Sequence, residues 1–231
     1  MPIFSHEKIA LELSGGKDSV ACLFHMRPYL PWITVYWLNT GDAYPETVEV
    51  IDECRKLCPN FVEVRSDVRA WQRMNGAPSD VVPVTGECVH LPPKEKEIPC
   101  VDAYVCCANN IMLPLHERVV ADGNTLIIRG QRRSDEHKGP LKSGDCVDGI
   151  QVFYPIEDWT DAEVLDYLKA EGAPIHPVYT HSDHGVDCLH CTGWWRKTSL
   201  SFLKRHPAAY QHVTMARGII ARMTNERMSQ C

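Results

Sequence analysis

The sequence lacks several features that would place it in a specialised class of protein. No apolar run approaches the roughly 18 residues that a membrane-spanning helix needs, and there is no internal repeat or low-complexity segment. Residues 1–13 contain neither a basic leader nor a long apolar core, so we expect no secretory signal and, by default, a cytoplasmic protein. With 44% apolar and 23% charged residues, the 231-residue chain instead fits a globular protein with a sizeable core.

Cysteine, by contrast, is abundant. The chain contains 11 cysteines. An odd number in a chain without an export signal does not suggest a disulfide framework. Metal binding, an iron–sulfur cluster or sulfur chemistry is therefore the leading explanation.

Charge is distributed unevenly. The whole chain carries a net charge of -6, whereas residues 192–231 contain seven Lys or Arg and one acidic residue, a net charge of +6 that leaves -12 for the rest. Such a tail favours contact with an anionic partner, although a solvated basic helix gives the same pattern.

Apolar runs alternate with amphipathic stretches in the first third of the chain. This pattern predicts strands over residues 8–13, 33–38 and 61–64, with helices over 17–29 and 45–58. Alternation of this kind predicts an α/β protein with a parallel sheet and crossover helices.

The remainder predicts a long ordered loop over 75–100 and then further regular elements. These are a helix over 101–120 containing Pro114, a strand over 125–128, a polar loop over 129–144, a strand over 150–154 and a helix from the cap Thr160 to Lys169. A final helix carries an apolar face formed by Ala209, Val213, Ala216, Ile220 and Met223.

A glycine-containing loop stands between the first predicted strand and helix. It consists of Ser14, Gly15, Gly16, Lys17, Asp18 and Ser19. The two glycines allow the backbone to approach a phosphate, and the helix N-terminus attracts an anion. The lysine adds a positive charge, the serine hydroxyls can donate to phosphate oxygens, and the aspartate can hold Mg²⁺ beside them.

This loop resembles the pyrophosphatase (PP) loop of the adenine-nucleotide alpha-hydrolase superfamily. Members of the superfamily bind ATP on a Rossmann-like sheet and cleave it between the α and β phosphates. Three further segments resemble the phosphoadenosine-phosphosulfate (PAPS) reductase family within it: residues 39–47, 130–136 and 154–160. The resemblance covers about residues 8–192 and implies a Rossmann-like parallel sheet with flanking helices. We therefore expect a PP-loop nucleotide-binding and iron–sulfur domain over 1–192 and a basic helical C-terminal tail over 193–231.

The resemblance also implies further nucleotide-site residues. Asn39, Thr40, Gly41 and Asp42 would lie at the end of the second strand near the nucleotide, where a doubly wound sheet binds its ligands. An ordinary turn is the competing interpretation of these four residues. Gly130 would belong to the same site.

Positive charge is concentrated in the loop that follows residue 128. Its basic residues are Arg129, Arg132, Arg133, Lys138 and Lys142, against the acidic Asp135 and Glu136. Guanidinium groups bind phosphate or sulfate through paired hydrogen bonds, so we expect the loop to cover the anionic end of the nucleotide. We take Arg132 and Arg133, together with Lys17 and Asp18, as candidate catalytic residues. A solvated run of charge is the alternative interpretation of the basic loop.

Four cysteines resemble the iron–sulfur motif of adenosine-phosphosulfate reductases. Cys106 and Cys107 are adjacent, and after 80 intervening residues Cys188 and Cys191 form a Cys-x-x-Cys pair. The resemblance implies that the four thiolates hold a 4Fe-4S cluster. Zinc is the other metal considered, because four histidines lie close to the pair in sequence: His176, His181, His184 and His190. Unligated cysteines are the third interpretation.

Spacing does not assign the other cysteines. Cys54 and Cys58 lie four residues apart on a predicted helix and fit ordinary half-buried positions. Cys146, beside the basic loop, is a candidate sulfur-carrying or redox thiol. The remaining cysteines are Cys22, Cys88, Cys100 and Cys231.

Two departures from the reductase pattern determine the predicted chemistry. In the sulfonucleotide reductases the first loop is altered, whereas here it is intact, and the cysteine-containing C-terminal segment of those enzymes has no counterpart in the tail, whose only thiol is Cys231. The combination resembles ATP-dependent sulfur insertion of the DNA phosphorothioation or tRNA thiolation type.

In that reaction ATP-Mg²⁺ adenylates an acceptor oxygen, pyrophosphate leaves, and a sulfur nucleophile displaces AMP. The alternatives are a thiol-dependent reductase of adenosine phosphosulfate or PAPS that forms sulfite, and a non-catalytic module that senses nucleotide or redox state.

These interpretations imply partners. Nucleic acid could bind the tail through phosphate contacts and base stacking, with side chains from Trp194, Trp195, Arg196, Lys197, Lys204 and Arg205. A cysteine desulfurase or a thioredoxin-like protein would supply sulfur or electrons. Packing of the tryptophans within the protein, or a homodimer contact of the helix, is the competing interpretation of the tail.

Overall fold

The structure of the chain is a computed structural model and describes residues 5–81, 98–135, 139–195 and 200–229. The chain divides into two compact units. Unit 1 comprises Met1–Asn39, Pro45–Arg65 and Pro114–Pro177, and unit 2 comprises Thr40–Tyr44, Ser66–Leu113 and Val178–Cys231. Within the described ranges, no helix is long and apolar enough to cross a membrane. The domain boundary placed after residue 192 stays a prediction.

Unit 1 contains the predicted parallel sheet. Its strands are β1 (Ile9–Glu12), β2 (Ile33–Asn39), β3 (Asn60–Arg65), β6 (Leu126–Arg129), β7 (Cys146–Val147) and β8 (Ile150–Phe153). They lie in the order β3-β2-β1-β6-β8-β7, and every neighbouring pair is parallel except the short hairpin of β7 and β8. The predicted α/β class is confirmed.

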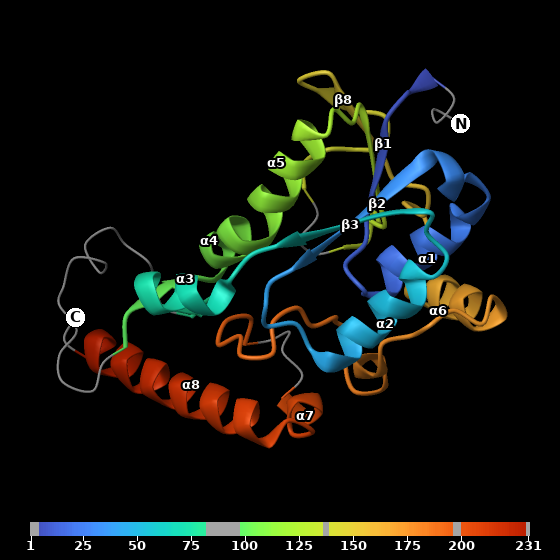
Figure 1. Cartoon of the computed structure of the whole chain (residues 1–231). Helices are drawn as coiled ribbons and strands as arrows, with labels where there is room; N and C mark the ends of the chain where they lie inside the picture. Colours follow the sequence, from blue (N-terminus) through green and yellow to red (C-terminus); the bar gives the residue numbers. More distant parts are fainter. Residues whose placement is uncertain (1–4, 82–97, 136–138, 196–199, 230–231) are drawn as a thin grey trace. The chain divides into compact units, whose positions relative to one another are not determined.

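Helices cover both faces of this sheet. They are α1 (Lys17–His25), α2 (Pro45–Arg55), α5 (Leu113–Ala121) and α6 (Asp161–Ala170). Figure 1 shows α5 on one side of β1 to β3 and the other three helices on the opposite side. Successive strand side chains point to opposite faces, and Ala10, Tyr36 and Ile127 form one buried cluster with Val119 of α5.

Local capping explains where several helices begin and end. Thr160 and Glu163 form the predicted capping box at the start of α6. The predicted helix over 17–29 ends at His25, because the prolines of the next segment allow only a 3₁₀ helix, η2 (Arg27–Trp32). The helix predicted to start at residue 101 begins at Ala103, since the Asp102 side chain accepts from the N–H groups of the first turn.

Unit 2 is largely helical. It contains α3 (Val68–Asn75), the strand pair β4 (Ala77–Ser79) and β5 (Cys100–Asp102), α4 (Ala103–Cys107), the π-helical turn η3 (Ala108–Met112), η4 (Pro177–Thr180), α7 (Leu200–Leu203) and α8 (Pro207–Met228), with Leu113 and Pro177 at the unit boundaries. The sequence did not predict α3, β4 or β5. The segment 82–97, within the predicted long loop, lies outside the described residues.

Pro114 accounts for the π-helical turn that precedes α5. Proline has no N–H to donate to the carbonyl four residues earlier, and its ring crowds that carbonyl. The carbonyl in question belongs to Asn110, and it accepts a hydrogen bond from Ser66 Oγ at 2.7 Å. The helical run therefore widens after Cys107.

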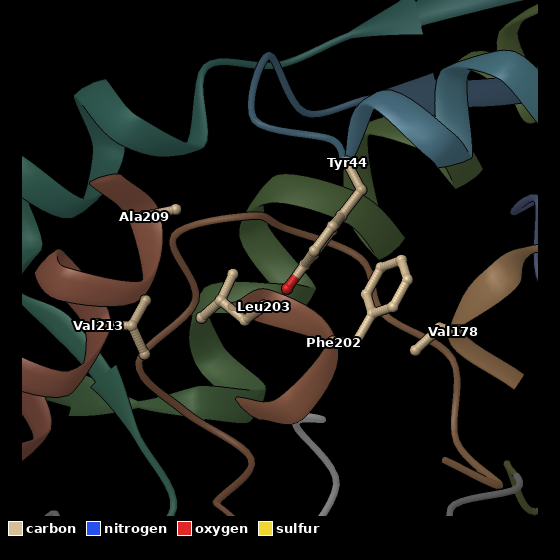
Figure 2. Packing of buried hydrophobic residues seen from close by; sticks show 6 residues of the cluster. All are labelled: Tyr44, Val178, Phe202, Leu203, Ala209 and Val213. Carbon is tan, nitrogen blue, oxygen red and sulfur yellow. The ribbon is translucent and has the colours of Figure 1, made fainter. Parts of the chain in front are cut away.

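The core of unit 2 is formed by residues that lie far apart in sequence. Figure 2 shows Tyr44, Val178, Phe202, Leu203, Ala209 and Val213 in one buried cluster. The Tyr44 and Phe202 rings lie 5.8 Å apart between centroids. All five residues of the predicted apolar face of the last helix are buried in α8, which confirms that prediction.

Candidate functional site

The Ser14–Ser19 loop follows β1 and includes the first turn of α1, which starts at Lys17. Gly15 has φ +82°, in the left-handed region that glycine adopts without strain, and Gly16 is the N-cap of α1. Gly16 N–H donates to Ser14 Oγ at 3.3 Å, and Ser14 N–H donates to Ser19 Oγ at 3.1 Å. A glycine N-cap brings no side chain to compete with an anion at the N-terminus of α1.

Gly130 follows β6 and lies directly against this loop. A Cβ atom at position 130 would be 2.4 Å from the carbonyl oxygen of Asp18 and 2.8 Å from the nitrogen of Ser19. Only glycine allows such a close approach. The segment after β6 is thereby held against the first turn of α1.

Five charged side chains of unit 1 meet at the loop. Lys17 Nζ lies 2.9 Å from Asp18 Oδ2 and 2.8 Å from Asp161 Oδ1. Arg132 contacts Asp18 Oδ1 at 2.7 Å, Asp161 Oδ1 at 3.0 Å and Asp135 Oδ1 at 3.3 Å. Both cations are 5% exposed. Two positive and three negative groups leave this cluster with a formal charge of -1.

Burial gives Asp18 an environment suited to a cation. It raises the pKa of the Asp18 carboxyl, although Lys17 and Arg132 oppose the shift. Asp18 Oδ1 and Arg132 Nε form an ion pair, but neither atom has a hydrogen bond among the described residues. A buried carboxylate oxygen of this kind fits a ligand of Mg²⁺.

The other basic residues of the predicted phosphate-covering loop have different partners. Arg129 is paired with Glu12 through contacts of 2.6 and 2.9 Å, and the exposed Arg133 contacts Asp158 at 2.9 Å. Cys146 is exposed in β7. Lys138 lies outside the described residues. Of the predicted catalytic residues, the structure therefore brings Lys17, Asp18 and Arg132 together.

Sequence reasoning missed Asp135 and Asp161 as members of the cluster. Asp161 is the first residue of α6, directly after the Thr160 cap. Its place at the start of a predicted helix, directly after the segment 154–160 that resembles the family, was the available signal.

The segment predicted to follow the second strand divides between the two units. Asn39 lies in unit 1 and donates to Glu63 Oε1 at 3.0 Å. Burial raises the pKa of Glu63, but hydrogen bonds from Asn39, Arg55 and Arg65 outweigh burial and hold it below its ordinary value. The nucleotide contact predicted for Asn39 stays a prediction.

Thr40, Gly41 and Asp42 lie in unit 2, where they hold the Cys188–Cys191 turn. Asp42 Oδ2 accepts from the His190 N–H at 3.0 Å, and Asp42 Oδ1 lies 2.6 Å from His190 Nδ1. Thr40 Oγ1 lies 3.6 Å from Cys188 Sγ. Gly41 has φ +73°. These contacts give the segment a structural role beside the cysteines, and its nucleotide role stays a prediction.

All four predicted cluster ligands lie in unit 2, close enough to act on one another electrostatically. Burial is the largest cause that raises the pKa values of all four thiols, and the neighbouring cysteines add to the shift of Cys191. The resulting pKa is about 12 for Cys107 and about 12 for Cys191. Thiols with these pKa values are protonated at neutral pH, so a thiolate at these positions needs a compensating cation.

Each of the four sulfurs has a hydrogen-bonding group beside it. Gln72 Nε2 and Asn110 Nδ2 donate to Cys106 Sγ at 3.8 and 3.9 Å. Hydrogen bonds from Trp194 and from the backbone of Gly193 favour the thiolates of Cys107 and Cys191, and the Thr40 hydroxyl favours that of Cys188. Donors around sulfur are the groups that stabilise and tune a metal-bound thiolate.

The histidines near the cysteine pair have different surroundings. His176 lies in unit 1, where its Nε2 contacts Thr47 Oγ1 at 3.2 Å, and the His181 ring packs on Phe202 in unit 2. His184 is exposed and donates its backbone N–H to Ser182 Oγ. In the described part of the chain, no three His, Cys, Asp or Glu side chains form a group that could hold a single metal ion.

Arg217 of α8 supports the residues that follow the Cys-x-x-Cys turn. It is 6% exposed and donates to the carbonyl oxygens of Thr192 at 3.0 Å and Gly193 at 2.5 Å. Its guanidinium lies 5.2 Å from the Trp195 ring centroid. Trp195 and Arg217 therefore have packing roles in unit 2. Arg196 and Lys197, also named as tail contacts, lie outside the described residues.

Fold and site together define an α/β protein with a parallel sheet and a glycine loop between its first strand and first helix. The family described as the phosphoadenosine phosphosulfate reductase domain matches residues 8–194. The chain belongs to this family, which confirms the resemblance.

Curated relatives carry reductase names. The chain is 25% identical over 197 residues to a phosphoadenosine 5'-phosphosulfate reductase of Proteus mirabilis. The aligned region covers 82% of this chain and 73% of the Proteus protein. The chain is 26% identical over 167 residues to an adenosine 5'-phosphosulfate reductase of Burkholderia cepacia, covering 69% of this chain and 60% of the relative. The chain thus spans less than two thirds of the Burkholderia protein.

A solved structure has the same fold. The phosphoadenylyl-sulfate reductase of Candida auris, in a phosphate complex, superposes with a TM-score of 0.53 at 13% identity, over 83% of each chain.

Proposed function

We propose that the chain is an ATP pyrophosphatase of the PAPS reductase family that adenylates an acceptor for iron–sulfur-dependent sulfur transfer. The observation that carries the proposal is the intact Ser14–Ser19 loop, in which buried Lys17 and half-buried Asp18 meet the buried Arg132. Sulfonucleotide reductases, which release no pyrophosphate, have this loop altered. A loop that retains its glycines, lysine and aspartate is suited to bind the phosphates of a nucleoside triphosphate.

The residues of the loop support cleavage between the α and β phosphates. The acceptor oxygen attacks the α phosphorus, the α–β phosphoanhydride P–O bond breaks, and its electron pair leaves with pyrophosphate. Lys17 and Arg132 stabilise the negative charge that develops on the leaving group. Asp18 would hold Mg²⁺ beside the phosphates, and the N-terminus of α1 attracts an anion.

The cysteines of unit 2 support the sulfur step. Cys106, Cys107, Cys188 and Cys191 would hold a 4Fe-4S cluster, because each sulfur has a hydrogen-bonding neighbour and burial makes an uncompensated thiolate costly. When bound, a cluster supplies a site for sulfur or electrons. A sulfur nucleophile, from a cysteine desulfurase or another donor, then displaces AMP from the activated acceptor.

The proposed acceptor is nucleic acid. The net charge of +6 over residues 192–231 supports an anionic acceptor. Cys146 is exposed and could carry sulfur as a persulfide, so it is retained as a candidate.

A thiol-dependent reductase of adenosine phosphosulfate or PAPS is the second candidate function, and the names of the relatives favour it. It predicts sulfite formation with ATP left intact. A third candidate, a nucleotide- or redox-sensing module, predicts ATP binding without turnover.

One anaerobic preparation separates the three. It is incubated with ATP-Mg²⁺ and oligonucleotide, or with adenosine phosphosulfate and a thiol reductant, while pyrophosphate and sulfite are followed. We expect pyrophosphate from ATP and no sulfite. Lys17→Met should abolish release, whereas the control Lys56→Met, at an exposed lysine paired with Glu53, should not. Sulfite with intact ATP would reject the proposal in favour of the reductase.

The cluster is tested separately by iron and acid-labile sulfide per chain. We expect Cys107→Ser to lower both strongly. Cys58→Ser, at a half-buried cysteine of unit 1 outside the proposed ligand set, should retain both. Equal iron content in the two variants would exclude Cys107 as a ligand.

A further inference from the structure

The carboxylate of Asp161 occupies an unusual position in the nucleotide loop of unit 1. One oxygen, Oδ1, lies 2.8 Å from Lys17 Nζ and 3.0 Å from Arg132 Nη2. The two cations are 5% exposed, whereas Asp161 is 61% exposed. A single solvent-side oxygen anion therefore bridges two buried cations.

A phosphate oxygen makes the same kind of contact. It is a negatively charged oxygen that accepts charge-assisted hydrogen bonds from lysine and arginine. We propose that Asp161 Oδ1 takes the place of a pyrophosphate oxygen while the nucleotide site is empty, leaves when the nucleotide binds, and returns when pyrophosphate departs. The inference rests on the proposed function, because it takes the loop as the site of a nucleotide's phosphates.

The local structure allows Asp161 to move without unfolding its helix. Asp161 is the first residue of α6, and the capping box that starts this helix is formed by Thr160 and Glu163. Thr160 N–H donates to Glu163 Oε2 at 2.7 Å, and Glu163 N–H donates to Thr160 Oγ1 at 3.3 Å. Neither hydrogen bond involves the Asp161 side chain.

Charge balance gives the exchange its direction. With Asp161 in place, the five charged side chains at the loop sum to -1, which opposes the binding of a further anion. When the Asp161 carboxylate turns away, Lys17 and Arg132 balance Asp18 and Asp135. Return of the carboxylate would restore both contacts and promote release of pyrophosphate, so Asp161 would act as a positioning residue that sets affinity for the leaving group.

Asp161→Asn tests the proposal, because it removes the charge and keeps the shape. The matched control is Asp166→Asn, which removes another carboxylate from the same helix. The Asp166 side chain is 77% exposed, and its Oδ1 lies 3.4 Å from Lys169 Nζ. Binding of inorganic pyrophosphate is measured by calorimetry without Mg²⁺ and with it. Asp161→Ser is a second variant, and thermal unfolding establishes that all variants are folded.

We expect Asp161→Asn to bind pyrophosphate about 3- to 10-fold more tightly than wild type without Mg²⁺, because a partly screened competing charge has been removed. Asp166→Asn should bind as wild type does. Unchanged or weaker binding by both Asp161 variants, or no binding to any protein, would overturn the proposal. Weaker binding only with Mg²⁺ would also overturn it and would assign Asp161 to the metal.

This result is distinguishable from failure of the proposed function. Tighter pyrophosphate binding by Asp161→Asn, with no pyrophosphate release from ATP by the wild type, would retain the exchange and reject the pyrophosphatase. Release of pyrophosphate from ATP together with unchanged binding by Asp161→Asn would do the reverse.

Discussion

Substitution of Gly130 by alanine should separate the loop after β6 from the start of α1. The new Cβ atom would lie 2.4 Å from the carbonyl oxygen of Asp18 and 2.6 Å from its carbonyl carbon. Both atoms belong to the backbone of a helical turn, so relief requires one main-chain segment to move. Overpacking of this kind costs about 1–3 kcal/mol.

We expect two effects of Gly130→Ala. The free energy of unfolding, measured by urea titration, should fall by about 1–3 kcal/mol. The dissociation constant for α,β-methylene ATP, which cannot be cleaved between its α and β phosphates, should rise at least about 10-fold, because Arg132 follows Gly130 by two residues and moves away from Asp18.

Gly139 provides the control within the same loop. Among the described residues beyond its chain neighbours, a Cβ atom at position 139 would meet no atom within 4 Å, so Gly139→Ala should change neither quantity appreciably. If Gly130→Ala bound the analogue as tightly as Gly139→Ala and were equally stable, the close approach of Gly130 to Asp18 would be refuted as the basis of the site.

Three further predictions concern other parts of the molecule. Arg217→Ala should lower the free energy of unfolding by about 2–5 kcal/mol and reduce the iron content, because two carbonyl oxygens lose a buried charged donor. Arg222→Ala, at an exposed arginine of the same helix, is the control, and equal stability of the two variants would contradict the supporting role of Arg217. In the metal-free protein at pH 8, iodoacetamide should modify the exposed Cys146 well before the half-buried Cys107, whose pKa is raised to about 12, chiefly by burial. Mass spectrometry follows both sites, and equal rates would contradict the raised pKa of Cys107. Because the pKa of Glu63 is lowered in the folded protein, its carboxylate stabilises the fold above the ordinary carboxyl pKa, and this stabilisation is lost as the pH falls through the folded-state pKa. In denaturant titrations, Glu63→Gln should therefore lose less stability than wild type between pH 7 and pH 3.

Short-range patterns predicted much of unit 1. The strands at residues 8–13, 33–38 and 61–64 and the capped helix after Thr160 could be predicted because period, capping and length are local properties. Helix ends were less accurate where proline or a capping aspartate intervened, as at Asp102. The short helix α3 was missed because it has only eight residues, of which Val68 alone is buried.

The arrangement of the candidate site depended on contacts that sequence does not encode locally. Lys17 and Asp18 were identified from the loop, but Asp161 joins them from a helix more than 140 residues later. Likewise, nothing in the segment Thr40–Asp42 indicates that it holds His190 and Cys188. The family resemblance supplied the cysteine set, and the structure supplied the donors beside each sulfur.

The central claim is that ATP is cleaved between its α and β phosphates at the Ser14–Ser19 loop. Phosphorus-31 NMR of the anaerobic protein with ATP-Mg²⁺, oligonucleotide and a sulfide donor tests it most directly. The account predicts that AMP and pyrophosphate appear in equal amounts and that neither forms with Lys17→Met. Intact ATP, or ADP with inorganic phosphate, would contradict it.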